Sequence, residues 1–404
     1  MLEETAVALG QLRAGHNDGS LPFLRVADQA DAIATLEPIA EKYVESFDQV
    51  VFFGVGGSSL GARTICGLAS EPVGHERPRL HFLDNIDPSS FTYLIRSIDP
   101  ARTGFVVTSK SGSTPETMSQ FLVALELIRD GSSRGAVGEH FTAITEPGAR
   151  PLRTLAEMFS IPVLDHDPGI GGRYAALSVV GLLPALIAGL DAEALIEGAA
   201  DALQPLLDGA APGDFAPAVG AAIQVGLAQH AGIRATVLMP YLDRMANLGL
   251  WHRQLWAESL GKDGHGTTPI NAIGATDQHS QLQLYLDGPA DKMFTLLSAS
   301  AKGQGSTISN ALARQAGVDY LAGRRMGDLM DAELRATSAA LSEAKRPVRL
   351  FTIDNADEAD MGSLMMHFMA ETVIAAYLLG VNAFDQPAVE KGKVLARHYL
   401  EDGN

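Results

Sequence analysis

The sequence predicts an α/β fold of two domains, each a parallel sheet flanked by helices, with a helical C-terminal tail. Short apolar segments alternate with helix-like segments in the first half of the chain, and the alternation resumes in the second half. Such alternation is typical of right-handed βαβ units, whose strands form parallel sheets covered on both faces. A chain of 404 residues with 46% hydrophobic residues is long and apolar enough to bury the cores of two such domains.

The first part of the chain predicts a helical leader and one sheet. We expect residues 1–47 to form the leader, with its main helix over 27–47, and residues 48–190 to form the first domain. Short runs rich in Val, Ile and Phe have the composition of buried strands, and the stretches between them have helical spacing. The predicted strands are 49–53, 80–83, 104–108, 141–145 and 162–164, and the helices between them are 60–68, 89–98, 114–130 and 152–159.

The second part predicts a helical linker, a second sheet and a tail. Residues 191–232 are helical in pattern with a Pro-Gly break at 211–214, and residues 191–380 form the expected second domain. Residues 381–404 form the tail, which could pack across a domain boundary and donate a side chain to a site. The predicted strands are 234–240, 269–273, 292–298 and 348–353, and the last helices are 361–379 and 388–400.

Composition and charge exclude several classes of function. The net charge of −18 and the lack of a basic run argue against nucleic acid or an anionic membrane as a partner. The most apolar stretch, 175–190, contains Pro184 and two glycines and predicts a buried core helix rather than a membrane span. The single cysteine, Cys66, excludes an intrachain disulfide and fits a cytoplasmic protein, as does an N-terminus without the features of a signal peptide.

A hydroxyl-rich turn, residues 109–117, leads from a predicted strand into a predicted helix. Thr114 is a plausible N-cap and Pro115 suits the first helical position. The free backbone N–H groups and the positive dipole end of such a helix favour an anion, and five hydroxyls with one lysine surround this one. The turn therefore predicts a phosphate site, although an ordinary capped helix start is the alternative interpretation.

A second glycine-rich turn, residues 54–61, also follows a strand and opens a helix. Its glycines allow backbone N–H groups to approach an oxyanion, and it would face the same crevice as the hydroxyl-rich turn. It departs from the dinucleotide fingerprint because the third glycine is displaced and Ser58 and Ser59 intervene. A nicotinamide cofactor is therefore the weaker interpretation.

Two further segments carry charged or amide side chains in a suggestive setting. Arg173 lies among glycines directly before a long apolar helix, where a guanidinium can face developing negative charge or simply pair with a surface carboxylate. Gln254 and Glu258 are four residues apart and share one face of a predicted helix. An exposed glutamate at a helix end is commonplace, so this pair alone predicts little.

Together these motifs occur in the order found in glucose-6-phosphate isomerases, also called phosphoglucose isomerases, and the chain resembles this family over nearly its whole length. The family has two sugar-isomerase (SIS) domains, each a parallel sheet flanked by helices, and the chain is short even beside its compact bacterial members. The departures are Ala175, where Ser or Thr is usual, and Pro387, where many relatives carry Trp. The matching motifs are residues 54–61, 109–117, 171–174, 254–259, 276–280 and 384–393.

The resemblance implies a role for each matched residue in the interconversion of glucose 6-phosphate and fructose 6-phosphate through an enediol. Glu258 is the implied base, Arg173 stabilises the intermediate, and His279 with Lys393 opens the sugar ring. It also implies a homodimer in which the histidine reaches the partner's active site. The implied substrate-binding residues are Ser58, Ser59, Ser109, Lys110, Ser111, Thr114, Gln254 and Gln386.

The implied chemistry suits these residue types. A carboxylate beside a sugar carbonyl can move a proton between adjacent carbons, acting as acid and base in turn, so neither a metal nor a cofactor is expected. Two alternatives stay open from the sequence: an isomerase that also accepts mannose 6-phosphate, and a non-catalytic sugar-phosphate sensor. The joint presence of Glu258, Arg173, His279 and Lys393 disfavours the sensor.

Overall fold

The computed structural model describes residues 1–69, 77–131 and 137–402, and it contains two separate parallel sheets. The first sheet has the strand order β2-β1-β3-β4-β5. Its central strands are buried along their whole length or nearly so, as expected where helices cover both faces of a parallel sheet. The strands are β1 Gln49–Phe53, β2 Arg79–Leu83, β3 Thr103–Thr108, β4 Phe141–Thr145 and β5 Val163–Asp165.

The second sheet has the strand order β7-β6-β8-β9, again with every neighbouring pair parallel. In each sheet the second strand in the chain lies on one side of the first strand, and the third strand lies on its other side. The strand order therefore reverses beside β1 in the first sheet and beside β6 in the second. The strands are β6 Ala235–Pro240, β7 Thr268–Asn271, β8 Lys292–Ala299 and β9 Val348–Ile353. The predicted α/β class with two parallel sheets is confirmed.

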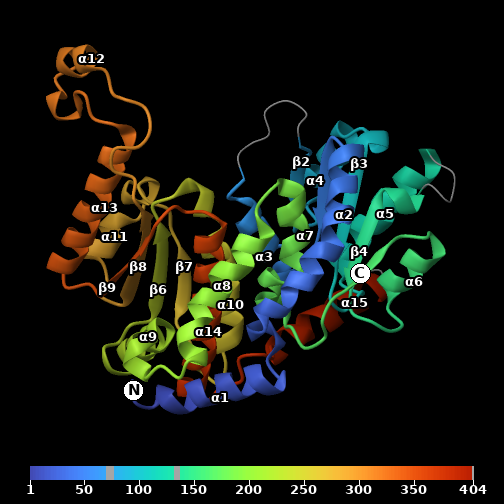
Figure 1. The fold of residues 1–404 in the computed structure, drawn as a ribbon, viewed down its shortest axis with the longest axis horizontal. Helices are drawn as coiled ribbons and strands as arrows, with labels where there is room; N and C mark the ends of the chain where they lie inside the picture. The colour runs from blue at the N-terminus through green and yellow to red at the C-terminus, as the bar shows by residue number, and fades with distance from the viewer. Residues whose placement is uncertain (70–76, 132–136, 403–404) are drawn as a thin grey trace.

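Helices pack on both faces of each sheet (Figure 1). Beside the first sheet the chain forms α2 Ala30–Ser46, α3 Leu60–Cys66, α4 Pro88–Ser97, α5 Pro115–Gly131, α6 Pro151–Met158 and α7 Val179–Ala188. Beside the second sheet it forms α9 Ala216–His230, α10 Leu248–Leu260, α11 Leu282–Asp287 and α13 Met326–Glu343. An N-terminal helix, α1 Thr5–Asp18, packs against the long helix α14, Glu358–Leu379.

The largest apolar core lies between the two sheets. It joins side chains from the inner faces of both sheets, such as Phe52 and Leu297, with those of α7, α10, α14 and α8, Ala192–Leu207. Helix α14 is long and apolar enough to cross a membrane by length and composition, but most of its apolar window is buried in this core. Because this core is continuous, the two sheets are held in a fixed relation, and side chains from each can meet at one site.

A buried cluster of charges ties α14 to the second sheet. The carboxylate of Glu371 accepts hydrogen bonds from Arg349 Nη1 at 2.8 Å and Gln224 Nε2 at 2.6 Å, and lies 3.0 Å from His367 Nε2. Burial alone would raise the pKa of Glu371, but the Arg349 guanidinium and the His367 ring outweigh it and lower that pKa to about 2. Glu371 is therefore an ionised carboxylate inside the core.

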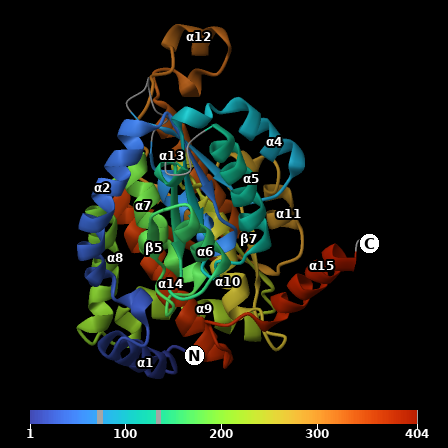
Figure 2. The ribbon, with the colours of Figure 1, turned by 90° about the vertical axis from the view of Figure 1, so that its right-hand side faces the viewer.

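Two segments project from the body (Figure 2). One is the arm, residues 300–325, which includes α12 Asn310–Gln315 and exposes Leu312 and Tyr320. The other is α15, Glu390–Asp402, all of whose residues are exposed. The predicted tail helix 388–400 is thus present, shifted by two residues, and Gln386, in the tail before this helix, accepts a hydrogen bond from Arg173. The predicted domain boundaries at residues 47, 190 and 380 stay a prediction.

Candidate active site

The glycine turn after β1 lies against both the segment of Arg173 and helix α10. A Cβ on Gly57 would lie 2.1 Å from the carbonyl carbon of Gly172, and one on Gly56 would lie 2.8 Å from Gln254 Nε2. Gly56 also has a φ of 58°, a backbone conformation that favours glycine. These glycines are therefore needed for close packing. The turn brings the carboxyl end of β1 close to α10.

The two serines of this turn differ in their surroundings. Ser58 ends a short 3₁₀ helix, Gly56–Ser58, and is half-buried, whereas Ser59 is buried at the start of α3. Among the described residues the Ser59 hydroxyl has no hydrogen-bond partner. Buried polar atoms are almost always hydrogen-bonded, so a bound ligand is the natural partner for this hydroxyl.

The hydroxyl-rich turn has the geometry of an anion cradle. Ser109 Oγ and Thr114 Oγ1 are 3.0 Å apart and hydrogen-bonded, and α5 begins at Pro115 as predicted. Within the described part of the chain, the backbone N–H groups of Lys110 and Ser111 find no acceptor. Successive free N–H groups at a turn, followed by a helix N-terminus, favour a phosphate.

The Lys110 side chain contacts the loop that leads into Arg173. Its ammonium donates to the carbonyl oxygens of Pro168 and Ile170, both at 2.9 Å, and lies 3.5 Å from Glu146 Oε1. The ammonium thus ties the hydroxyl-rich turn to that loop, and the predicted contact of Lys110 with the substrate phosphate stays a prediction.

Arg173 is the most constrained side chain of the site. It lies in the 3₁₀ segment Gly172–Leu177 and is 4% exposed, so its charge must be compensated locally. A guanidinium has five N–H donors, and each of these has an acceptor. The acceptors are Ser259 Oγ at 2.8 Å, Gln386 Oε1 at 2.8 Å, Glu258 Oε2 at 3.3 Å, and the carbonyl oxygens of Asp385, at 3.0 Å, and Ala383.

Glu258 lies between an amide and a guanidinium. Its Oε1 accepts from Gln254 Nε2 at 3.1 Å, one helical turn earlier on α10, and its Oε2 accepts from Arg173 Nη1. The Glu258 side chain is 33% exposed, whereas that of Arg173 is 3% exposed, so a ligand can reach the carboxylate while the arginine stays enclosed. The other amide atom of Gln254, Oε1, is buried and has no partner among the described residues.

The structure thus brings four predicted site residues into contact: Arg173, Glu258, Gln254 and Gln386. The glycine turn packs against them, the hydroxyl-rich turn is linked to the Arg173 segment through Lys110, and His279 and Lys393 lie elsewhere. His279 follows the 3₁₀ helix Thr276–Gln278 and is exposed, and in the described ranges its ring makes no hydrogen bond. Lys393 lies on the exposed helix α15 and pairs with Glu390 at 2.7 Å. Neither contacts Glu258 or Arg173 within one chain.

Several contributors to the site are absent from the sequence-based prediction. Ser259 holds Arg173, and its hydroxyl also lies 3.0 Å from the Tyr174 hydroxyl, whose pKa burial raises. Thr117, in the first turn of α5, is fully buried, and its hydroxyl is unpartnered in the described structure. In the sequence, Ser259 is marked only as the last residue of the Gln-x-x-x-Glu-Ser motif, and Thr117 only as one of the five hydroxyl residues of the hydroxyl-rich turn.

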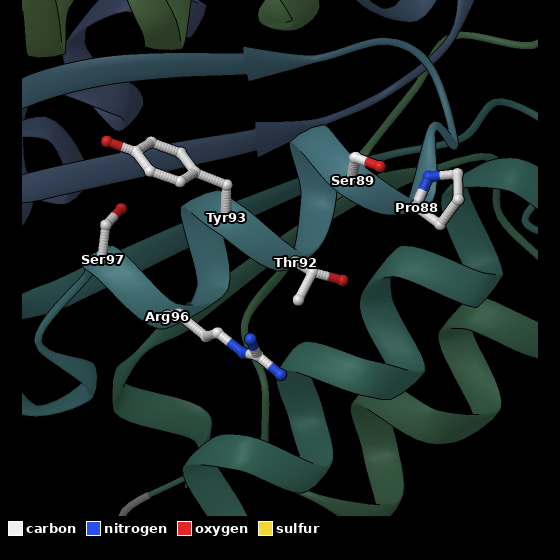
Figure 3. A pocket seen from close by; sticks show the side chains of 6 residues that line it. All are labelled: Pro88, Ser89, Thr92, Tyr93, Arg96 and Ser97. Atoms are coloured by element: carbon white, nitrogen blue, oxygen red, sulfur yellow. The ribbon is translucent and has the colours of Figure 1, made fainter.

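A separate surface pocket lies on helix α4, and Figure 3 shows its lining. The six side chains that line it all come from this one helix: Pro88, Ser89, Thr92, Tyr93, Arg96 and Ser97. None of them is a predicted site residue. The candidate active site is therefore the convergence of the two turns, the Arg173 segment and α10, not this pocket.

The chain is similar in sequence to curated glucose-6-phosphate isomerases. The chain is 38% identical over 377 residues to a glucose-6-phosphate isomerase of Rubrobacter xylanophilus, covering 92% of this chain and 87% of that protein. It is 36% identical over 370 residues to a glucose-6-phosphate isomerase of Thermus thermophilus, covering 89% of this chain and 85% of that protein. Both relatives are thus matched over most of their length.

Solved structures share the fold. A hypothetical protein of Thermus thermophilus superposes with a TM-score of 0.90 at 33% identity, covering 99% of this chain and 94% of that one. A glucose-6-phosphate isomerase of Chlamydia trachomatis superposes with a TM-score of 0.78 at 23% identity, covering 92% of this chain and 73% of that one. The family model described as phosphoglucose isomerase matches residues 40–403. The chain therefore belongs to the phosphoglucose isomerase family.

Proposed function

We propose that this chain interconverts glucose 6-phosphate and fructose 6-phosphate through an enediol intermediate. The observation that carries the proposal is the carboxylate of Glu258, held between Gln254 at 3.1 Å and Arg173 at 3.3 Å. The hydroxyl-rich turn, the proposed phosphate anchor, is tied through Lys110 to the loop that leads into Arg173. The reaction is a step of glycolysis and of gluconeogenesis.

Glu258 is the proposed acid and base. Hydrogen bonds to both of its oxygens fix the plane of the carboxylate, so one oxygen can take the proton from C2 and return it to C1. Arg173 stabilises the oxygen that becomes negative in the enediolate, because a fixed cation in a water-poor site needs no reorganisation. All five N–H groups of Arg173 have acceptors, so the enediolate must share or replace one of them.

The substrate phosphate binds in the hydroxyl-rich turn in this proposal. Ser109 and Thr114 contribute hydroxyls, Ser111 contributes its hydroxyl and N–H, and Lys110 contributes its N–H while its ammonium holds the neighbouring loop. Binding energy from the phosphate holds the reacting carbons against Glu258. The residues that complete the sugar pocket are Ser58, Ser59, Gln254 and Gln386.

Ring opening is proposed to involve His279 and Lys393, as a proton donor and an amine at the anomeric end. Because neither side chain reaches Glu258 within one chain, a homodimer with shared active sites is part of the proposal. The exposed apolar side chains on both projecting segments support it: Leu312 and Tyr320 on the arm, with Val394, Tyr399 and Leu400 on α15. Such side chains gathered on projecting elements are typical of an interface.

The proposed setting is the cytoplasm, where phosphorylated sugars are found and where a single cysteine stays reduced. The acidic chain, with a net charge of −18, also favours a small-molecule substrate over nucleic acid.

A coupled assay on fructose 6-phosphate, mannose 6-phosphate and glucosamine 6-phosphate tests the activity. We expect fast conversion of fructose 6-phosphate to glucose 6-phosphate. A sensor would bind fructose 6-phosphate without turnover, and this outcome would contradict the proposed activity. Comparable rates with mannose 6-phosphate would instead assign the broader specificity.

A further inference from the structure

A short strap, residues 382–386, holds the Arg173 guanidinium together with Ser259. It follows the C-terminal end of α14 and precedes α15, and its backbone belongs to no helix or strand. Three of its oxygens accept hydrogen bonds from Arg173: the carbonyl oxygens of Ala383 and Asp385, and the side-chain Oε1 of Gln386. The direction of Arg173 Nη1 therefore depends on where the strap lies.

Lys262 anchors the strap to the helix that carries Glu258. Its ammonium lies 3.0 Å from Asp385 Oδ1, donates to the carbonyl oxygen of Asn382, and donates to the carbonyl oxygen of Ser259 at 3.0 Å. Lys262 follows the C-terminal end of α10, and only 12% of its side chain is exposed. One ammonium thus joins the end of α10 to two points of the strap.

This connection closes a ring of contacts around the reacting groups. Helix α10 supplies Glu258, Ser259 and, just beyond its end, Lys262. Ser259 and the strap then hold Arg173, and Arg173 contacts Glu258. An irregular segment without such an anchor would sample many backbone conformations, because ordering the backbone costs conformational entropy.

We propose that Lys262 is a positioning residue that sets the direction of Arg173 by fixing the strap through Asp385. The inference rests on the proposed roles of Arg173 and Glu258. Lys262 has no part in binding the phosphate, since its ammonium is committed to the strap and to α10. Loss of its charge should therefore lower kcat and leave KM for fructose 6-phosphate nearly unchanged.

The sharpest test is Asp385→Asn, because the Asp385 side chain is 52% exposed and the change keeps the backbone carbonyl that Arg173 uses. We expect kcat for fructose 6-phosphate to fall between about 10-fold and 100-fold, the loss typical of a small misplacement of a reacting group, with KM within about twofold. Lys262→Met should give at least the same loss, because it also removes the hydrogen bonds to the carbonyl oxygens of Asn382 and Ser259, and Lys262→Arg should recover most of it. The double variant should be no worse than Lys262→Met alone, because that change already removes the ion pair with Asp385.

Lys292→Met is the matched control. Lys292 is also enclosed, with 10% of its side chain exposed, and it pairs with Asp291 at the amino end of β8, away from the site. It should keep the wild-type kcat, whatever it loses in stability. Arg173→Lys tests the role of Arg173 separately from the positioning role of Lys262, because this change should lower kcat directly.

If Arg173→Lys lowers kcat while Asp385→Asn and Lys262→Met keep the wild-type value, the positioning role of Lys262 is wrong and the proposed function stands. If Arg173→Lys keeps the wild-type kcat, the role of Arg173 is wrong and the inference falls with it. A loss in Lys292→Met equal to that in Lys262→Met would also overturn the inference, since general destabilisation would then explain both.

Discussion

Arg173 Nη1 lies 3.3 Å from Glu258 Oε2, although the two residues are 85 positions apart in the chain. The glycine turn after β1 explains how they meet, because its backbone packs directly on Gly172 and on Gln254. The continuous core between the sheets keeps that turn and α10 in a fixed relation. The Glu258 carboxylate and the Arg173 guanidinium are therefore positioned by backbone packing.

The paired hydroxyls of the cradle should govern substrate binding. Ser109→Ala combined with Thr114→Ala removes both proposed phosphate contacts and the hydrogen bond between the two hydroxyls. We expect KM for fructose 6-phosphate to rise by at least about 100-fold, since each of the two lost hydrogen bonds to a charged group costs about 1.5–3 kcal/mol. Steady-state kinetics check this, with the exposed Ser119→Ala as the control. An unchanged KM would place the phosphate elsewhere.

A substitution of Lys110 tests whether its ammonium holds the loop before Arg173 or binds the substrate phosphate. Its ammonium contacts the carbonyl oxygens of Pro168 and Ile170, so Lys110→Met should loosen the loop before Arg173 and lower kcat. We expect a loss of about 10-fold in kcat, with KM changed less than about threefold. Initial rates across a range of fructose 6-phosphate concentrations separate the two parameters. A large rise in KM at constant kcat would show that the ammonium binds the phosphate.

Shared active sites predict complementation between inactive chains. Glu258→Gln and His279→Asn should each be inactive alone, because each removes one catalytic group from every site. After mixing, unfolding and refolding together, a mixed dimer would carry one site with both groups intact. Random pairing then predicts recovery of about a quarter of wild-type activity. No recovery from an equal mixture of refolded chains would mean that both groups come from the same subunit.

The free energy of unfolding should decrease as the pH falls, because of a buried histidine. The pKa of His252 is lowered from 6.5 to about 4, chiefly by burial; the charge of Glu371 raises it, and the charges of Arg349 and His367 lower it. The unfolded chain therefore takes up a proton at a higher pH than the native chain does, so stability decreases as the pH falls from 6.5 towards 4.

His252→Phe isolates this effect. It should lose about 2 kcal/mol less of its free energy of unfolding than the wild type does between pH 7 and pH 5. A phenylalanine also suits the site, where the ring stacks on Trp256 and meets Phe368 edge-on. Urea unfolding at the two pH values measures the difference, and equal losses in both proteins would rule out the buried histidine as the cause.

The sequence predicted the sheets well because buried parallel strands such as 104–108 and 141–145 are short segments rich in apolar and β-branched residues. It also placed the two turns, since strand–turn–helix transitions leave local signals in Gly, Ser and Pro. The direction of the Lys110 ammonium had no local signal, because its partners are carbonyl groups 58 and 60 positions away. The contacts of Arg173 with Ala383 and Asp385 are equally remote, at 210 and 212 positions.

The proton-transfer step gives the most direct test of the account. Fructose 6-phosphate incubated in heavy water with the wild-type chain should acquire deuterium, and Glu258→Gln should slow this exchange by at least about 100-fold. The variant should still bind sorbitol 6-phosphate, which carries the phosphate but no carbonyl, with an affinity close to that of the wild type. Full exchange in Glu258→Gln would contradict the account, because another group would then have to move the proton.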